Sequence, residues 1–342
     1  MSPSFAIRYE MSITAADVGS RVSVRRKLPD GGLGDVLGDL ESWSDGVLTV
    51  RRKDGDLVRV AEVDLVAGKV VPARRVIARR HDLVPDADVE AVAALGWQGL
   101  ETERLGGWLL RAAGGWTGRA NSALPLGDPG LDPEAAIDAV VAWYAERGLT
   151  PQFQVPVPLA ADLDDRLAAR GWECPYGVGG IHLMTGDVAA VLEAAGPDRE
   201  DLPPVTLSPA PSPGWLGVYR YREVPLPPVA IEVLTRATAP VFAEVVLDGR
   251  TVATGRGAID AGWLGIFAME TTEAARRRGL ARSVMLALIR HARTAGARHV
   301  YLQVSADNTA AVALYRSLGL TVHHHYHYRR APMARTDDGE QC

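Results

Sequence analysis

The chain has 342 residues, of which 47% are hydrophobic and 23% charged, and its formal net charge at pH 7 is −5. This composition is typical of a globular protein, and the length predicts two or three domains. The mild negative charge argues against a general affinity for nucleic acid or for an anionic membrane surface. The two cysteines, Cys174 and Cys342, lie far apart in the chain, which argues against a disulfide framework.

The sequence contains no signal for a membrane location. No apolar stretch reaches the ~18 residues of a membrane-spanning helix. The N-terminus lacks the basic and apolar regions of a secretory signal. We therefore expect a cytoplasmic protein without a membrane partner.

Residues 11–78 predict a small β-barrel of the Src-homology type. Short β-rich runs at 21–25, 34–37, 46–51, 57–60 and 70–71 alternate with turns such as Asp54-Gly55. Its basic clusters at 25–27 and 51–53 could contact nucleic acid, or the domain could tether the chain to a partner. Acidic residues are interspersed with these clusters, so we expect a solvated or interdomain surface and no nucleic-acid binding.

Residues 80–196 are predicted to form a degenerate copy of the last third of the chain. A helix pattern at 135–148, a strand at 152–155 and a second helix pattern at 163–171 recur in the same order at 284–296, 301–304 and 311–319. Such self-similarity indicates an internal duplication. A proline-rich stretch at 197–213 is expected to link the two copies.

The segment from Arg276 to Ala281 carries the strongest functional signal. It reads Arg-x-x-Gly-x-Ala and lies between the apolar run 263–269 and a helix whose buried face recurs at three- and four-residue spacing, up to Gly296. A strand that passes through a glycine-containing turn into a helix exposes backbone N–H groups at the positive end of the helix dipole. This pattern predicts a binding site for a pyrophosphate.

The residues after Gly296 extend this pattern in a fixed order. A strand at 299–304 is followed by Asp307 and Asn308 at a helix start, and the helix contains Tyr315. Gly319 ends that helix, and a last strand runs over 320–328. The order of strand, Arg-x-x-Gly-x-Ala, helix, strand, asparagine, tyrosine-bearing helix and strand resembles the CoA-dependent N-acetyltransferases of the GNAT superfamily, over residues 205–330.

The resemblance implies a fold of the α/β (α+β) class. We expect two tandem GNAT-like mixed-sheet domains, the first degenerate, preceded by the small β-barrel. The catalytic domain would span residues 205–332, and residues 333–342 are expected to be a disordered tail because they are polar and charged.

The resemblance also implies roles for individual residues, with acetyl-CoA as cosubstrate. The backbone of Met269, Glu270 and Thr271 would bind the pantetheine arm, and Asn308 would contact the cofactor. Tyr315 would also contact it and act as the general acid that protonates the departing CoA thiolate. The pyrophosphate would be bound by Arg276, Arg277, Arg278, Gly279, Leu280, Ala281 and Arg282.

The general base is less well defined by the sequence. Some members of the superfamily place a glutamate on the central strand where this chain has Gly265 and Ile266. Glu270 is the nearest carboxylate and is the candidate catalytic base, acting directly or through water, while Asp260 lies near the preceding strand end. A substrate that arrives already deprotonated would need no base.

The first copy differs from the second at the positions where catalytic and cofactor-binding residues are expected. Leu167 stands where the second copy has Tyr315, and residues 108–135 contain no Arg-x-x-Gly-x-Ala, only the remnant Gly118 to Asn121. We expect the first copy to have lost catalysis, to pack against the active copy and to form part of the acceptor cleft. A second, non-catalytic CoA site is the alternative.

A histidine cluster near the C-terminus raises the question of a metal. On a regular strand, His323, His325 and His327 would share one face and could approach one ion. No cysteine or carboxylate lies near them in sequence, so we expect surface or pocket-lining imidazoles and no metal.

The function predicted from these observations is transfer of an acetyl group from acetyl-CoA to a primary amine on a small molecule or a peptide. The chain is expected to be a monomer or a homodimer. A non-catalytic acyl-CoA-binding or regulatory module is the alternative, and the retained Tyr315 counts against it.

Overall fold

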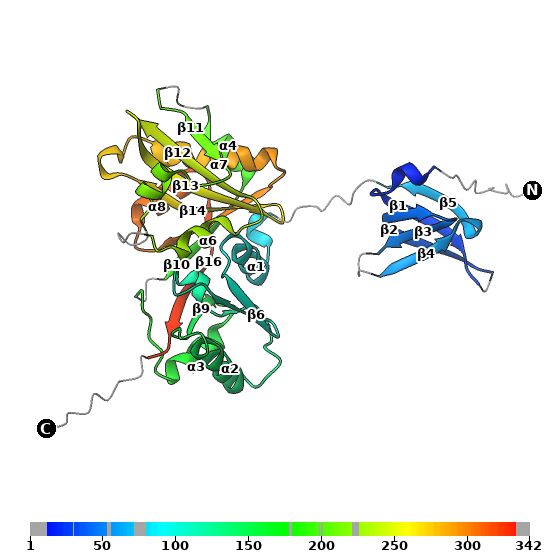
Figure 1. Ribbon diagram of the computed structural model, residues 1–342, viewed down its shortest axis with the longest axis horizontal. Helices are drawn as coiled ribbons and strands as arrows, with labels where there is room; N and C mark the ends of the chain where they lie inside the picture. The colour runs from blue at the N-terminus through cyan, green and yellow to red at the C-terminus, as the bar shows by residue number, and fades with distance from the viewer. Residues whose placement is uncertain are drawn as a thin grey trace, which may run out of the picture. The chain divides into compact units, whose positions relative to one another are not determined.

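The computed structural model describes residues 12–29, 31–52, 56–71, 80–177, 180–197, 199, 201–220 and 226–332. Its contacts divide the chain into two compact units, Met1–Ala78 and Arg79–Cys342 (Figure 1). The expected tail 333–342 and the turn Asp54-Gly55 lie outside the described residues.

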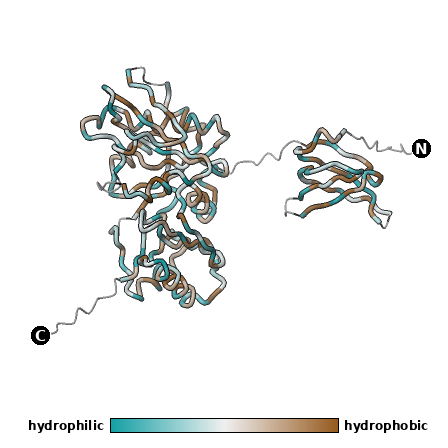
Figure 2. Tube along the Cα trace, viewed as in Figure 1, coloured by the Kyte–Doolittle hydropathy of each residue, from teal (hydrophilic) through white to brown (hydrophobic). Residues whose placement is uncertain are grey.

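The N-terminal unit is an antiparallel sheet of five strands in the order β4-β3-β2-β1-β5. Buried and exposed residues alternate along its strands, so that Val22, Val24, Leu40, Leu48 and Val50 form its core. Figure 2 shows hydrophobic and hydrophilic segments side by side along this unit. The first four predicted runs coincide with β1 to β4, but the fifth, at 70–71, meets only the last residue of β5 and is therefore wrong. Its elements are η1 (Ala15–Asp17), β1 (Arg21–Lys27), β2 (Leu33–Ser44), β3 (Val47–Arg51), β4 (Leu57–Ala61), η2 (Glu62–Asp64) and β5 (Leu65–Val70).

The second unit contains an eight-stranded mixed sheet in the order β11-β12-β13-β14-β15-β10-β16-β9 and a three-stranded sheet β6-β7-β8. Its strands are β6 (Glu101–Leu105), β7 (Trp108–Ala112), β8 (Leu124–Pro125), β9 (Gln152–Val157), β10 (Ile181–Asp187), β11 (Val205–Ser208), β12 (Pro240–Leu247), β13 (Arg250–Asp260), β14 (Trp263–Thr271), β15 (His299–Ser305) and β16 (Thr321–Arg330). Its helices are η3 (His81–Leu83), α1 (Asp86–Gly96), η4 (Arg119–Asn121), α2 (Pro133–Ala145), α3 (Ala161–Ala169), α4 (Val188–Ala195), α5 (Pro213–Val218), α6 (Val229–Thr235), η5 (Glu273–Ala275), α7 (Leu280–Thr294) and α8 (Thr309–Ser317).

Helices cover both faces of the large sheet. Leu264 and Ile266 of β14 pack into a core formed with α4, α7 and α8. Trp263 and Phe267 point the other way, into a core formed with α1, α5 and α6. This alternation follows from the period of two in a strand and explains why β14 is apolar on both faces.

The two copies exchange their last strands. β10 follows α3 of the first copy but pairs with β15 of the second, from Ile181↔Ser305 to Asp187↔His299. β16 follows α8 of the second copy, and its C-terminal half pairs with β9 of the first. The long β16 therefore runs from one copy into the other (Figure 1). The two segments share one sheet within a single compact unit.

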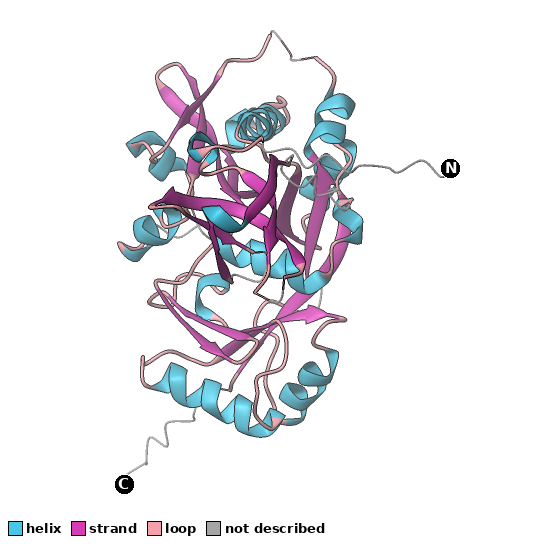
Figure 3. Cartoon of the chain, turned by 90° about the vertical axis from the view of Figure 1, so that its right-hand side faces the viewer, coloured by secondary structure: helices cyan, strands magenta, loops and turns pink. Residues whose placement is uncertain are grey.

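The first copy keeps a core of its own. Helices α2 and α3 lie together against β7 and β9, with Ile137, Tyr144, Phe153 and Leu167 buried between them (Figure 3). Across the described residues, no helix is both long enough and apolar enough to span a lipid bilayer.

Candidate active site

Strands β14 and β15 separate along their length and open a gap in the sheet. They pair in parallel only from Trp263↔His299 to Ile266↔Leu302. Beyond that point the β13–β14 register shifts, and Ala268 has a positive φ of 51°. Such a bulge bends a strand away from its neighbour. The backbone of the rest of β14, including Met269 to Thr271, therefore pairs with none of the described strands on the β15 side.

A cavity of about 590 Å³ lies at this gap. Gln303 of β15 lines it, and both polar atoms of the Gln303 amide are buried without a hydrogen-bond partner among the described residues. A buried amide without a partner costs stability unless a ligand or water satisfies it. Gln303 has no distinguishing pattern in the sequence, because its unpaired amide arises only from the strand separation.

The segment after β14 forms an open helix start. Arg277 has φ of 63° and Gly279 has φ of 88°, so the chain turns sharply before α7 begins at Leu280. No side chain caps this helix, and no acceptor among the described residues pairs with the backbone N–H groups of residues 277–282. Together with the positive end of the helix dipole, these N–H groups provide the geometry that binds a phosphate.

Arginines surround this helix start. Arg276 Nε donates to Thr271 O at 3.2 Å, and Arg282 Nη2 donates to Ala195 O at 2.6 Å, at the end of α4. A Cβ added at Gly279 would lie 3.3 Å from a guanidinium nitrogen of Arg199. Arg277 and Arg278 are exposed. The guanidinium of Arg282 therefore holds α4 beside the loop, whereas the guanidinium of Arg199, which the sequence did not indicate, is paired with the carboxylate of Asp201.

Two of the predicted residues have local partners. Glu270 is half-buried; its Oε1 accepts from Thr271 N at 3.3 Å and lies 3.8 Å from Arg276 Nη2. Asn308 caps α8, where its Oδ1 accepts from Ala311 N at 3.1 Å. Because β14 and β15 are parallel, their carboxyl ends and the starts of α7 and α8 lie at the same edge of the sheet.

Tyr315 lies on α8 in the core between that helix and the sheet. Burial raises the pKa of Tyr315 to about 12, so its phenol is protonated at neutral pH. No hydrogen bond from this hydroxyl is formed with the described residues. A protonated phenol without an internal acceptor is chemically suited to donate a proton.

The structure explains why no glutamate occupies the central strand. A Cβ at Gly265 would come within 2.4 Å of the Tyr301 hydroxyl and 2.6 Å of the Phe267 ring. Tyr301 is fully buried and fills the volume that a side chain at position 265 would need. A side-chain base cannot be built at this position without displacing the Tyr301 ring.

The first copy contributes to the cavity lining. Trp97 Nε1 donates to Thr117 Oγ1 at 3.1 Å, and the Arg119 guanidinium lies 5.6 Å from the ring centres of both Trp97 and Phe267. Tyr176 lies on the same cavity. The sequence predicts that the first copy borders the acceptor cleft, and Arg119 belongs to the motif remnant Gly118 to Asn121. No sequence motif marks Trp97 or Tyr176 as a cavity residue.

The sequence predicts that His323, His325 and His327 share one face of a regular strand, and this prediction is wrong. The β10–β16 register shifts at His323, since Leu183 pairs with His324 while Met184 pairs with Val322. The extra residue places the side chains of His323 and His324 together, with ring nitrogens 2.9 Å apart. His327 instead bonds Asp164 at 2.7 Å.

Comparisons with known proteins agree with this fold. A family model described as "Probable histone acetyltransferase Rv0428c C-terminal" matches residues 87–329, and one described as "Rv0428c N-terminal Sm-like domain" matches residues 16–69. A solved GCN5-related N-acetyltransferase from Kribbella flavida shares the fold, with a TM-score of 0.52 and 18% identity over 74% of this chain and 95% of that one.

Two curated relatives cover most of the chain. The chain is 33% identical over 330 residues to "Probable histone acetyltransferase Rv0428c" of Mycobacterium tuberculosis, covering 91% of this chain and 94% of the relative. It is 26% identical over 250 residues to "Uncharacterized N-acetyltransferase YobR" of Bacillus subtilis, covering 70% and 96%. The chain therefore belongs to the family of the probable histone acetyltransferase Rv0428c, with an Sm-like domain ahead of a region that has the fold of the GCN5-related N-acetyltransferases.

Proposed function

We propose that this protein transfers an acetyl group from acetyl-CoA to a primary amine by direct attack of the amine on the thioester. The observation that carries this proposal is the uncapped start of α7, which directly follows the strand that separates from β15. Enzymes of the GNAT superfamily use acetyl-CoA, and the geometry of this edge of the sheet fits that cosubstrate.

The chain supplies the binding groups from two adjoining segments. The backbone N–H groups of residues 277–282 would hold the pyrophosphate, because they lack acceptors among the described residues. The open edge of Met269, Glu270 and Thr271 would bind the pantetheine arm through the backbone. Acetyl-CoA supplies an acetyl group activated as a thioester.

Protons move through two side chains in this proposal. Tyr315 donates the proton that neutralises the leaving sulfur, since its phenol remains protonated in the folded protein. Glu270 takes the proton of the attacking amine, directly or through water. A backbone N–H on the separated part of β14 stabilises the oxyanion that forms at the acetyl carbon.

The acceptor is proposed to enter the cavity between the two copies. The cavity brings the Gln303 amide, the Arg119 guanidinium and the rings of Trp97, Tyr176 and Phe267 next to the strand gap. Rings and an amide would orient the carbon skeleton of an amine, on a small molecule or on a peptide. The name of the M. tuberculosis relative makes a protein lysine one acceptor to include in the test.

A screen of primary amines for acetyl-CoA-dependent release of free CoA tests the proposal, and lysine peptides belong in the panel. Acetyl-CoA alone at 100 times its dissociation constant should stabilise the protein by about 2.7 kcal/mol. Stabilisation without turnover on any amine would favour the alternative of a non-catalytic acyl-CoA-binding module. No stabilisation would contradict both.

A further inference from the structure

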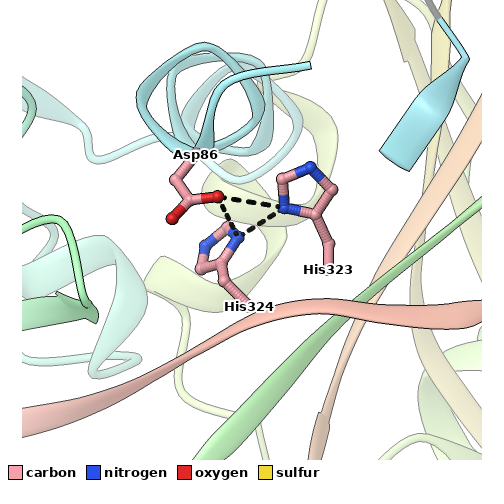
Figure 4. Close-up of side chains that lie close together, drawn as sticks. All are labelled: Asp86, His323 and His324. Atoms are coloured by element: carbon pink, nitrogen blue, oxygen red, sulfur yellow. Dashed lines mark hydrogen bonds and ion pairs between the residues drawn. The ribbon is translucent and has the colours of Figure 1, made fainter. Parts of the chain in front are cut away.

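Three side chains from distant parts of the chain meet beside the strand exchange. His323 and His324 lie at the start of β16, and Asp86 is the first residue of α1 (Figure 4). The two Nδ1 atoms are 2.9 Å apart, and Asp86 Oδ1 lies 3.3 Å from His323 Nδ1 and 3.7 Å from His324 Nδ1. The imidazoles are almost fully buried, whereas the Asp86 side chain is 27% exposed.

The outer nitrogens of both rings are already committed as donors. His323 Nε2 lies 2.9 Å from Val84 O, and a carbonyl can only accept, so this nitrogen carries the hydrogen. His324 Nε2 lies 3.0 Å from Glu90 Oε1, and the other oxygen of this buried carboxylate accepts from Gln154 Nε2 at 2.8 Å. In neutral imidazoles with these tautomers, both Nδ1 atoms present lone pairs.

Two lone pairs and a carboxylate oxygen therefore face one another, and one cation placed between them would bind all three. The separations of 2.9, 3.3 and 3.7 Å lie around the value of about 3.4 Å expected between two tetrahedral ligands that are each about 2.1 Å from one ion. We propose that Asp86, His323 and His324 form a site for a divalent transition metal of the Zn²⁺ class, bound through two Nδ1 atoms and one carboxylate oxygen.

The surroundings of the three ligands have the features of a metal site. Metal-bound histidines characteristically donate their other N–H to a backbone carbonyl or a carboxylate, as His323 does to Val84 O and His324 to Glu90. Three protein ligands leave a fourth position, and the partial exposure of Asp86 gives water access to it.

The proposed metal would fasten α1 to β16. Trp97, which ends α1, lines the acceptor cavity, so the metal would fix the helix that carries part of that wall. No metal was expected from the sequence, because Asp86 lies far from the histidines in the chain and the bulge at His323 is a feature of the folded sheet. Metal binding at this site does not require that the protein transfers acetyl groups.

Metal binding to the full-length protein after chelator treatment tests the site. Isothermal titration with Zn²⁺ should give one site per chain, and Co²⁺ should give the visible absorption of a four-coordinate ion. Asp86→Asn should weaken Zn²⁺ affinity by at least the roughly 10- to 100-fold that loss of an outer partner costs. Zn²⁺ should raise the Tm of the wild type and not that of Asp86→Asn.

Asp88→Asn is the matched control. Asp88 is exposed on the same first turn of α1, and its substitution removes the same negative charge. It should bind Zn²⁺ as the wild type does. Circular dichroism of the chelated variants establishes that both are folded. Absence of Zn²⁺ and Co²⁺ binding to the wild type, or equal binding by the wild type and Asp86→Asn, would overturn the proposal and leave a shared proton between the two rings.

Discussion

The starts of α2 and α7 occupy corresponding places in the two copies. They differ in whether a side chain of the protein accepts hydrogen bonds from the free N–H groups of the helix. Asp132 caps α2 by accepting from Glu134 N at 3.0 Å, and Pro133 at the first position has no N–H to satisfy. Gly279 precedes α7 with no side-chain cap. The first copy satisfies its helix end internally and places a carboxylate there, whereas the second leaves its helix end open to an anion.

The same contrast appears on the next helix. Leu167 of α3 is fully buried in the core of the first copy, where it contributes only packing. Tyr315 of α8, its counterpart, is buried too, but its phenol has no acceptor among the described residues. The two copies therefore keep one scaffold and differ in whether polar groups are satisfied within the protein.

The largest effect is expected for Tyr315→Phe. Loss of a general acid should lower kcat by about 10²- to 10⁴-fold, because the sulfur would then leave without a positioned proton donor. Folding stability and the thermal shift caused by acetyl-CoA should persist, since the hydroxyl makes no hydrogen bond with the described residues. Steady-state kinetics beside thermal unfolding measures both, and an unchanged kcat would remove Tyr315 from the mechanism.

Leu167→Ala should show the reverse pattern. Removing this fully buried side chain leaves a cavity and should lower the free energy of unfolding by about 2–5 kcal/mol. At a temperature where the variant is fully folded, kcat should equal that of the wild type. Denaturant unfolding and kinetics decide the matter, and a fall in kcat of the folded variant would show that α3 takes part in the reaction.

Gly279→Asp would place a carboxylate at the start of α7, as Asp132 does at the start of α2. The negative charge would repel the pyrophosphate, so acetyl-CoA should bind about 10- to 100-fold more weakly. Gly296→Asp is the control, because Gly296 has a similar φ of 85° at the far end of the same helix, with no atom within 4 Å of an added Cβ. Calorimetric titration with acetyl-CoA should give a weaker affinity for Gly279→Asp than for Gly296→Asp. Equal affinities of the two variants would contradict the proposed pyrophosphate site.

Much of this organisation could be predicted from the sequence because its signals are local. Helix α7, the turn at Gly279 and the cap at Asn308 depend on residues within a few positions of one another, and the structure contains each of them. Four strands of the N-terminal unit were predicted for the same reason, since their alternation and turns lie in short runs. The fifth was predicted at 70–71 and lies at Leu65–Val70.

Features that depend on pairing across the sheet could not be predicted. The bulge that brings His323 beside His324 arises from the register with β10, whose residues lie far earlier in the chain. The unpaired amide of Gln303 follows from the separation of β14 and β15. The strand exchange leaves no mark in periodicity, because a strand has the same alternation whichever neighbour it joins.

The two halves of β16 also differ in how they are held. The half beside β10 carries the His323 and His324 cluster, whereas the half beside β9 is tied to α3 by one carboxylate, Asp164. Asp164 Oδ1 lies 2.7 Å from His327 Nε2. The same carboxylate accepts two hydrogen bonds from Arg329, at 2.7 Å from Nε and at 3.0 Å from Nη2. Burial raises the pKa of Asp164, but the hydrogen bonds from Arg329 and His327 outweigh it and leave the pKa below its ordinary value.

The smallest effect is expected for Asp164→Asn. It should lower the free energy of unfolding at pH 7 by about 1–2 kcal/mol, a value between the typical contributions of an exposed ion pair and of a buried hydrogen bond to a charged group. Because the folded-state pKa is lowered, this contribution is complete above the unfolded-state pKa of about 4 and is lost as pH falls through the folded value. Asp162→Asn, an exposed change on the same first turn, is the control. Urea unfolding at neutral and acidic pH should show a difference between the variants that disappears in acid; equal losses at both pH values would mean that Asp164 does not hold the exchanged strand through its charge.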